Sequence, residues 1–190
     1  MTLEIPPAEN WFKAKRHDQK YLRKALNTAT SLYHQLHEND RARALKAVNR
    51  INSIRHQLHE KATELGYVQK CIESMPVCKG LCCKWHFPKN LNCLDLFVTV
   101  CSISSREQKA LEAQIASDNG RYECPVLGEN GCVLPFHSRP LACSNAYPCF
   151  LGDSYYEFLT KKRKEIHIQH TLLKGILQKS GGALNQNALQ

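Results

Sequence analysis

Hydrophobic residues recur every three or four positions through the first third of the chain. Between Trp11 and Glu38 this spacing predicts one face of an amphipathic helix, formed by Leu22, Leu26, Ala29, Tyr33 and Leu36. Asn39 and Asp40 interrupt the pattern. A second helix is expected from Arg41, with Asp40 as its N-cap and Gly66 as its stop, carrying Leu45, Val48, Ile54, Leu58 and Leu65. Two long helices with so short a connection predict an antiparallel hairpin.

The pattern changes after Gly66. Cysteine, proline and glycine are dense from Cys71 to Phe150, which predicts short strands, turns and one helix. The range 94–103 is rich in Val, Phe and Thr and is the best strand candidate. The helix is expected from Ser104 or Ser105 to Ala116.

A last helix is expected after a capping box formed by Ser154 and Glu157. Its apolar positions continue to Ile176, and Gly181 and Gly182 follow its end. The fold class predicted by these patterns is α+β and mostly helical: an N-terminal antiparallel helical hairpin, a small irregular cysteine-rich core and a long C-terminal helix. The expected divisions are a basic hairpin at 1–66, a cysteine-cluster metal-binding domain at 67–152, the C-terminal helix at 153–180 and a disordered tail at 181–190.

Composition narrows the class of protein. With 190 residues and 43% hydrophobic content the chain can bury a core without disulfides. It shows neither a secretory leader pattern nor the roughly 20 consecutive apolar residues of a membrane span. We therefore expect a reducing, cytoplasmic location, where ten cysteines are better explained as metal ligands, redox thiols or core residues than as disulfides.

The net charge of +9 favours an acidic partner, whether nucleic acid, an anionic membrane surface or an acidic protein. A solvated basic surface is the alternative, because a site rich in thiolates also needs cations nearby. The run Lys161 to Lys164 is expected to be such a solvated face.

Nine of the ten cysteines lie between Cys78 and Cys149, in short motifs rich in Gly and Pro. Tight turns of this kind let thiolates converge within about 2.3 Å of a zinc ion. The metal-ligand candidates are Cys78, Cys82, Cys83, Cys124, Cys132, Cys143 and Cys149. Among them Cys78 and Cys149 rank second, Cys93 ranks third, and Cys71 and Cys101 are expected in the core.

Several motifs together resemble the YkgJ-type cysteine-cluster family over about the middle 80 residues. They are Cys82-Cys83, Ser104-Ser-Arg-Glu-Gln, Cys124-Pro-Val-Leu, Gly131-Cys-Val-Leu, Arg139-Pro-Leu-Ala-Cys143 and Tyr147-Pro148. The family's usual opening is C-x₂-C-x₂-C-C, whereas here Cys78 stands four residues before Cys82. The resemblance implies a domain that chelates zinc or iron. A flagellin lysine methylase that shares the cysteine motif implies an iron–sulfur cluster.

Side chains other than cysteine are also candidates at this site. Arg139 is expected to donate hydrogen bonds to a thiolate or to a backbone carbonyl beside the cluster, or to fix the turn before Pro140. His86 and His137 lie close to cysteines in the sequence and could replace one ligand. The thiols could also be buried and inactive, or form disulfides on oxidation.

The pentapeptide His-Gln-Leu-His-Glu occurs twice, at His34 to Glu38 and at His56 to Glu60. In the expected hairpin the two copies lie about 24 Å apart, so they cannot share one metal. Exposed or core-edge histidines are the simpler interpretation.

Three functions follow. The first is a metal-binding protein that holds zinc, iron or an iron–sulfur cluster. The second is a nucleic-acid-binding protein whose basic hairpin contacts phosphates through Lys13, Lys15, Arg16, Lys20, Arg23, Lys24, Arg41, Arg43, Lys46, Arg50 and Arg55. The third is a metal- or cluster-dependent enzyme related to protein lysine methylation. Catalysis is the weaker expectation, because the chain shows neither a nucleotide-binding glycine loop nor a nucleophile elbow.

Overall fold

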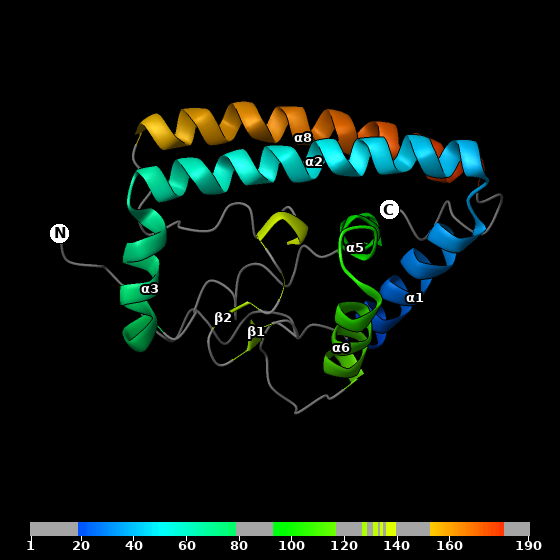
Figure 1. Cartoon of the computed structure of the whole chain (residues 1–190), viewed down its shortest axis with the longest axis horizontal. Helices are drawn as coiled ribbons and strands as arrows, with labels where there is room; N and C mark the ends of the chain where they lie inside the picture. Colours follow the sequence, from blue (N-terminus) through cyan, green and yellow to red (C-terminus); the bar gives the residue numbers. More distant parts are fainter. Residues whose placement is uncertain are drawn as a thin grey trace.

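Helices dominate the architecture (Figure 1). The computed structural model describes residues 19–78, 93–116, 127–128, 131–132, 134, 136–139 and 153–180. The helices are α1 (Gln19–Gln35), α2 (Glu38–Glu64), α3 (Tyr67–Cys78), α5 (Cys93–Val100), α6 (Ser105–Ala116), the short 3₁₀ helix η3 (Phe136–Ser138) and α8 (Asp153–Ser180). Strand β1 (Leu127–Gly128) pairs antiparallel with β2 (Gly131–Cys132). Two strands of two residues each do not make an α+β fold, so that prediction is wrong: the described residues form a helical protein.

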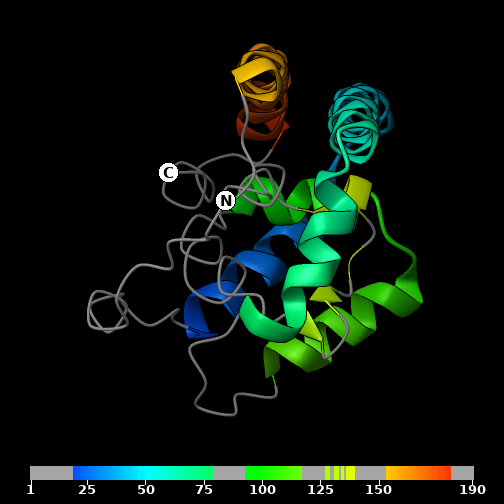
Figure 2. The ribbon, with the colours of Figure 1, turned by 90° about the vertical axis from the view of Figure 1, so that its left-hand side faces the viewer.

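The long helix α2 pairs with α8 and not with α1, so the predicted N-terminal hairpin is also wrong. The α2–α8 pair is antiparallel: the Ser180 hydroxyl at the end of α8 donates to Asp40 at the start of α2 over 2.7 Å. At the other end, the rings of Tyr67 and Tyr155 meet edge to face with centroids 5.4 Å apart. Figures 1 and 2 show α1 leaving α2 at a steep angle.

The turn between α1 and α2 is fixed by an arginine. Arg41 Nη2 donates to the carbonyl oxygens of Leu36 at 3.0 Å and His34 at 3.3 Å, which satisfies acceptors that the end of α1 leaves open. Its guanidinium also lies 5.6 Å from the centre of the Tyr33 ring. These contacts direct α1 away from α2 and toward α5 and α6.

The range predicted as a strand forms helix α5 instead. All eight residues of α5 are buried, including the polar Asp95 and Thr99, so no side of this helix faces solvent. Val, Phe and Thr favour strands on a half-buried sheet, but burial on every side removes that advantage. Tyr33 of α1 lies against the Phe97 ring at 6.4 Å between centroids.

Local sequence signals near the helix ends gave better predictions of the structure. Gly66 has φ +71° and follows the end of α2, as predicted. At the start of α6, Ser104 N donates to Glu107 Oε2 at 2.7 Å and Glu107 N donates to Ser104 Oγ at 3.3 Å, which confirms that helix start. The predicted last helix is confirmed as α8, which begins at Asp153. Helix α3 was missed, and α2 begins at Glu38, ahead of the predicted start at Arg41.

The core lies between the α2–α8 pair and the layer formed by α1, α5 and α6. Its completely buried apolar side chains include Ile51, Ile54, Phe97, Leu159 and Leu173. A hydrogen bond also joins the two layers: Asn52 Nδ2 of α2 donates to Ser102 Oγ, which follows α5, at 2.8 Å. The described helices thus share one hydrophobic core.

Candidate metal centre

The predicted ligands fall at the edges of the helical scaffold or outside the described residues. Cys78 is the last residue of α3, and Cys132 lies in β2, where its backbone pairs with Leu127. The side chains of both cysteines lie outside the described part of the chain, as do His86 and the remaining predicted ligands Cys82, Cys83, Cys124, Cys143 and Cys149. The predicted convergence of the thiolates therefore stays a prediction.

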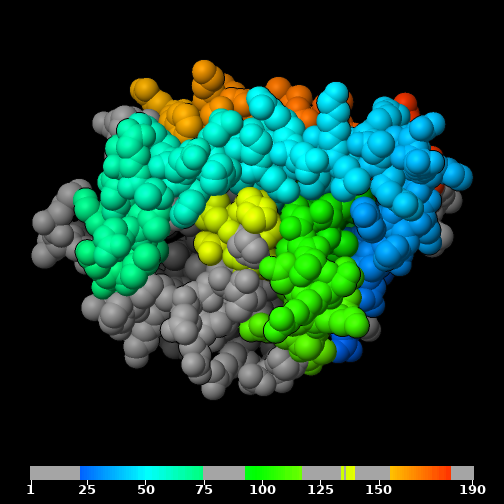
Figure 3. Space-filling model, in the orientation of Figure 1, coloured from blue at the N-terminus to red at the C-terminus, as the bar shows by residue number. Residues whose placement is uncertain are grey.

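One segment between two predicted ligands is firmly held by the helices. We call Leu134 and residues 136–139 the anchor segment; it follows Cys132 and precedes Cys143 in the sequence. Figure 3 shows η3 packed directly beneath α2, beside α5. Leu134 is 4% exposed and Ser138 is completely buried.

Helix α5 contacts the anchor segment through a buried hydroxyl. Thr99 Oγ1 lies 2.9 Å from the carbonyl oxygen of Ser138 and donates to it. The same hydroxyl lies 3.0 Å from the carbonyl oxygen of Asp95 within the helix. Because Thr99 is 0% exposed, water cannot replace this donor. The contact therefore fixes the position of η3 relative to α5.

Helix α2 contacts the anchor segment with two side chains one helical turn apart. Arg55 Nη1 donates to the carbonyl oxygen of His137 at 3.4 Å. The His59 ring stacks on Phe136, with centroids 4.3 Å apart and planes 29° from parallel. Together with Thr99, these residues hold the anchor segment from two helices that lie far apart in the sequence.

Arg139 braces the same turn from within. Its Nε donates to the carbonyl oxygen of Leu134 at 3.0 Å, and its guanidinium lies 5.4 Å from the centre of the Phe136 ring. Of the roles predicted for Arg139, the described contacts include a hydrogen bond to a backbone carbonyl and the bracing of the turn. A bond from Arg139 to a thiolate stays a prediction.

Two arginines, Arg55 and Arg139, contact the anchor segment, and Arg55 is completely buried. Burial lowers the pKa of His59, and the charges of Arg139 and His56 lower it further, while Glu60 opposes them. Burial, followed by the charge of Arg55, lowers the pKa of His170 on α8 to about 4. Burial and neighbouring cations thus disfavour protonation of both histidines.

Three cysteines are described with their side chains, and they belong to the apolar scaffold. Cys93 is buried in α5, and burial raises the pKa of its thiol to about 11. Burial raises the pKa of Cys101 to about 12. Cys71 is partly buried against the core. Within the described ranges, no three His, Cys, Asp or Glu side chains lie where they could hold one metal ion.

The two His-Gln-Leu-His-Glu copies lie on separate surfaces. His34 and His37 are exposed at the junction of α1 and α2. His56 is exposed on α2, 3.3 Å from Glu60, and His59 is turned toward the anchor segment. These histidines are exposed or lie at the edge of the core, as expected.

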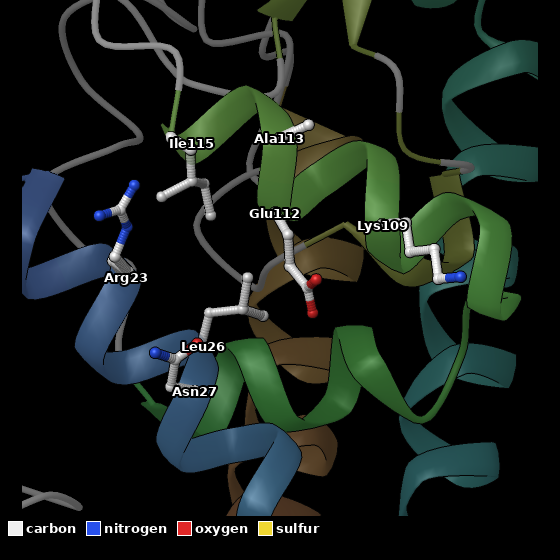
Figure 4. Close-up of a pocket in the computed structure, with 8 residues that line it drawn as sticks. Arg23, Leu26, Asn27, Lys109, Glu112, Ala113 and Ile115 are labelled. Atoms are coloured by element: carbon white, nitrogen blue, oxygen red, sulfur yellow. The ribbon is translucent and has the colours of Figure 1, made fainter.

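A pocket of about 490 Å³ opens elsewhere, between α1 and α6 (Figure 4). Its lining combines the cations Arg23 and Lys109 with one carboxylate, Glu112. Glu112 Oε1 accepts a hydrogen bond from Gln108 Nε2 at 3.0 Å. None of the described residues that line this pocket is a cysteine.

The basic helical hairpin expected to contact nucleic acid is not formed, and two of its arginines serve the scaffold. Arg55 is completely buried, and Arg41 is engaged with the end of α1. Sequence reasoning also missed Thr99 and His59 as holders of the anchor segment. No local signal identifies them, because their contacts join residues 39 and 77 positions apart.

No family model, curated protein or solved structure matches this chain. Among the described residues, no helix is both long enough and apolar enough to cross a membrane.

Proposed function

We propose that the chain is a metal-binding protein that holds zinc, iron or an iron–sulfur cluster through cysteine thiolates. Cys82, Cys83, Cys124, Cys132 and Cys143 are the first candidates, followed by Cys78 and Cys149. The YkgJ-type resemblance of these motifs supports the same chemistry. The structural observation that supports the proposal best is the anchor segment, held by Thr99, Arg55 and His59 between two of the candidate ligands.

A held segment favours metal binding because it lowers the entropic cost of assembling a site. Each flexible residue that must become ordered on binding costs about 1–2 kcal/mol of backbone entropy. The anchor segment is already ordered by contacts with α2 and α5, and β1–β2 pairing fixes the backbone of Cys132 opposite Leu127. Ligands carried on such supports begin closer to the bound arrangement.

Charge supports the same proposal. Four thiolates around one zinc ion carry a net charge of about −2, which must be offset nearby. Arg139, which contacts the anchor segment, lies between Cys132 and Cys143 in the sequence. A cation close to a thiol favours its thiolate form.

The ligand type admits both metals. Zinc would cross-link the cysteine-bearing segments as a tetrahedral structural ion, whereas an iron–sulfur cluster would add electron transfer. The proposal includes a reducing, cytoplasmic setting, since thiolates must escape oxidation to serve as ligands.

The test is the spectrum and metal content of the intact chain purified without oxygen. A brown protein with stoichiometric iron and acid-labile sulfide identifies a cluster, and a colourless protein with stoichiometric zinc identifies a zinc site. Cys132→Ser and Cys143→Ser should each lose the metal, whereas Cys71→Ser, at the edge of the core, should keep it. A wild-type chain that stays metal-free after anaerobic reconstitution with zinc or with iron and sulfide would refute the proposal.

A further inference from the structure

The α2–α8 pair presents an outer face on the side away from α1, α5 and α6. Figure 1 shows the two helices running side by side along the molecule's length, and Figure 2 shows them end-on above the other elements, with α8 higher than α2. Side chains on the outward sides of both helices can therefore meet the same partner.

Contacts between the helices show which residues share this face. Arg50 Nη2 of α2 lies 3.6 Å from Glu165 Oε2 of α8. Ile168 and Leu172 follow Glu165 by three and seven positions, which places them on the same face of α8. Arg43 and Lys46 precede Arg50 by seven and four positions on α2. We call this set the outer face: Arg43, Lys46, Arg50, Lys161, Lys164, Ile168, Leu172 and Lys179.

The outer face is rich in cations. Range 43–50 holds three cations and no acidic residue, and range 161–179 holds six cations and a single carboxylate, Glu165. Glu165 is already engaged by Lys162 at 3.0 Å and by Arg50. Lys46, Lys161, Lys164 and Lys179 are exposed. Arg43 is paired with Asp40 at 3.1 Å, so the positive field of this face comes mainly from these four lysines.

Two large aliphatic side chains lie among the cations of the outer face. Ile168 is 57% exposed and Leu172 is 55% exposed, one helical turn apart. They make no contribution to the core, which α8 contacts through Leu159, Ile166 and Leu173 on its opposite side. Scattered surface aliphatics are common, but a pair inside a cationic field combines two signals for one kind of partner.

We propose that the outer face docks on the surface of an anionic lipid bilayer. Lysine and arginine at a membrane surface are attracted to acidic headgroups, while aliphatic side chains enter the boundary between headgroups and acyl chains. The inference is independent of the cysteine site.

Other partners fit less well. A phosphodiester backbone would attract the same cations but offers no apolar layer for Ile168 and Leu172. A second copy of the chain would bring two cationic faces together and repel. The experiment includes an RNA that distinguishes a phosphodiester partner from lipid.

The experiment is co-sedimentation of the full chain with large vesicles. We expect binding to vesicles of phosphatidylcholine and phosphatidylserine at 70:30, weakening with salt, and at least tenfold weaker binding to pure phosphatidylcholine. The double variant Ile168→Ser/Leu172→Ser should lower partitioning about tenfold or more. Its matched control is Ile72→Ser on α3, where the side chain is 59% exposed, and it should bind like wild type.

A second pair of variants tests the charges. Lys46→Gln/Lys164→Gln should weaken binding to the anionic vesicles about 20-fold. The control Lys24→Gln/Lys109→Gln removes two exposed lysines from α1 and α6 and should change binding less than threefold. Thermal unfolding of each variant shows that it remains folded. Because these lysines are exposed, the charge variants keep the test valid even if the aliphatic double variant does not fold.

Three results would overturn the proposal. The first is equal binding to neutral and anionic vesicles, and the second is equal loss in the outer-face variants and their controls. The third is no vesicle binding together with salt-dependent binding of a 20-nucleotide polyuridine RNA, which would assign the cations to phosphates. None of these results would affect the metal-binding proposal, because the metal content of the protein is measured separately.

Discussion

Acidification should destabilise the protein through His170, which lies on the buried side of α8 near Arg55. Its pKa is lowered to about 4, chiefly by burial and then by the charges of Arg55 and His167. Its Nε2 is buried without a hydrogen-bond partner. In the unfolded chain the pKa returns to about 6.5. The unfolded state therefore binds more protons between these two values, and stability falls as the pH drops through that window.

The magnitude follows from the two pKa values. The full effect is on the order of 3 kcal/mol, and about 2 kcal/mol of it is lost by pH 5 relative to neutral pH. His170→Leu removes this titration and keeps an apolar surface against α2. At pH 7 the variant should be within about 1 kcal/mol of wild type, because it also removes an unpartnered nitrogen. At pH 5 it should be more stable than wild type by about 1–2 kcal/mol.

Urea unfolding at several pH values, followed by circular dichroism, measures this difference. His34→Gln, at an exposed position, is the control and should keep the wild-type pH dependence. The difference in the free energy of unfolding between wild type and variant cancels the contribution of the carboxylates, which titrate in both proteins. A difference that stays constant from pH 7 to pH 5 would refute the reasoning, because it would mean that His170 does not resist protonation in the folded state.

Three further substitutions test the scaffold by urea unfolding. Phe97→Ala should lower the free energy of unfolding by about 3–5 kcal/mol, since it empties a completely buried position; a loss below 1 kcal/mol would contradict the core assignment. Thr99→Val should cost about 1–3 kcal/mol by removing the donor to the anchor segment, whereas the exposed Thr171→Val should cost little. Ser104→Ala should cost about 1 kcal/mol through the capping box of α6, and an equal loss in Ser105→Ala would argue against capping.

The cysteine positions and their spacing were readable from the chain, and they carry the metal proposal. What holds the surrounding segment was not readable. Thr99 lies in a range whose composition favours a strand, and Arg55 was assigned to a basic surface, yet both are buried and contact the anchor segment. Residue type alone does not show that a cation will be enclosed, because enclosure depends on elements that arrive from elsewhere in the sequence.

The periodicity of the helices and some of their ends could be predicted from the amino-acid sequence, because both depend on neighbours within a few positions. The Ser104–Glu107 capping box and the left-handed Gly66 are examples. Periodicity shows which face of a helix will be buried, but not which element will cover it. The pairing of α2 with α8, and the helical state of α5, were decided by three-dimensional packing, because burial on all sides outweighs the modest strand preference of Val, Phe and Thr.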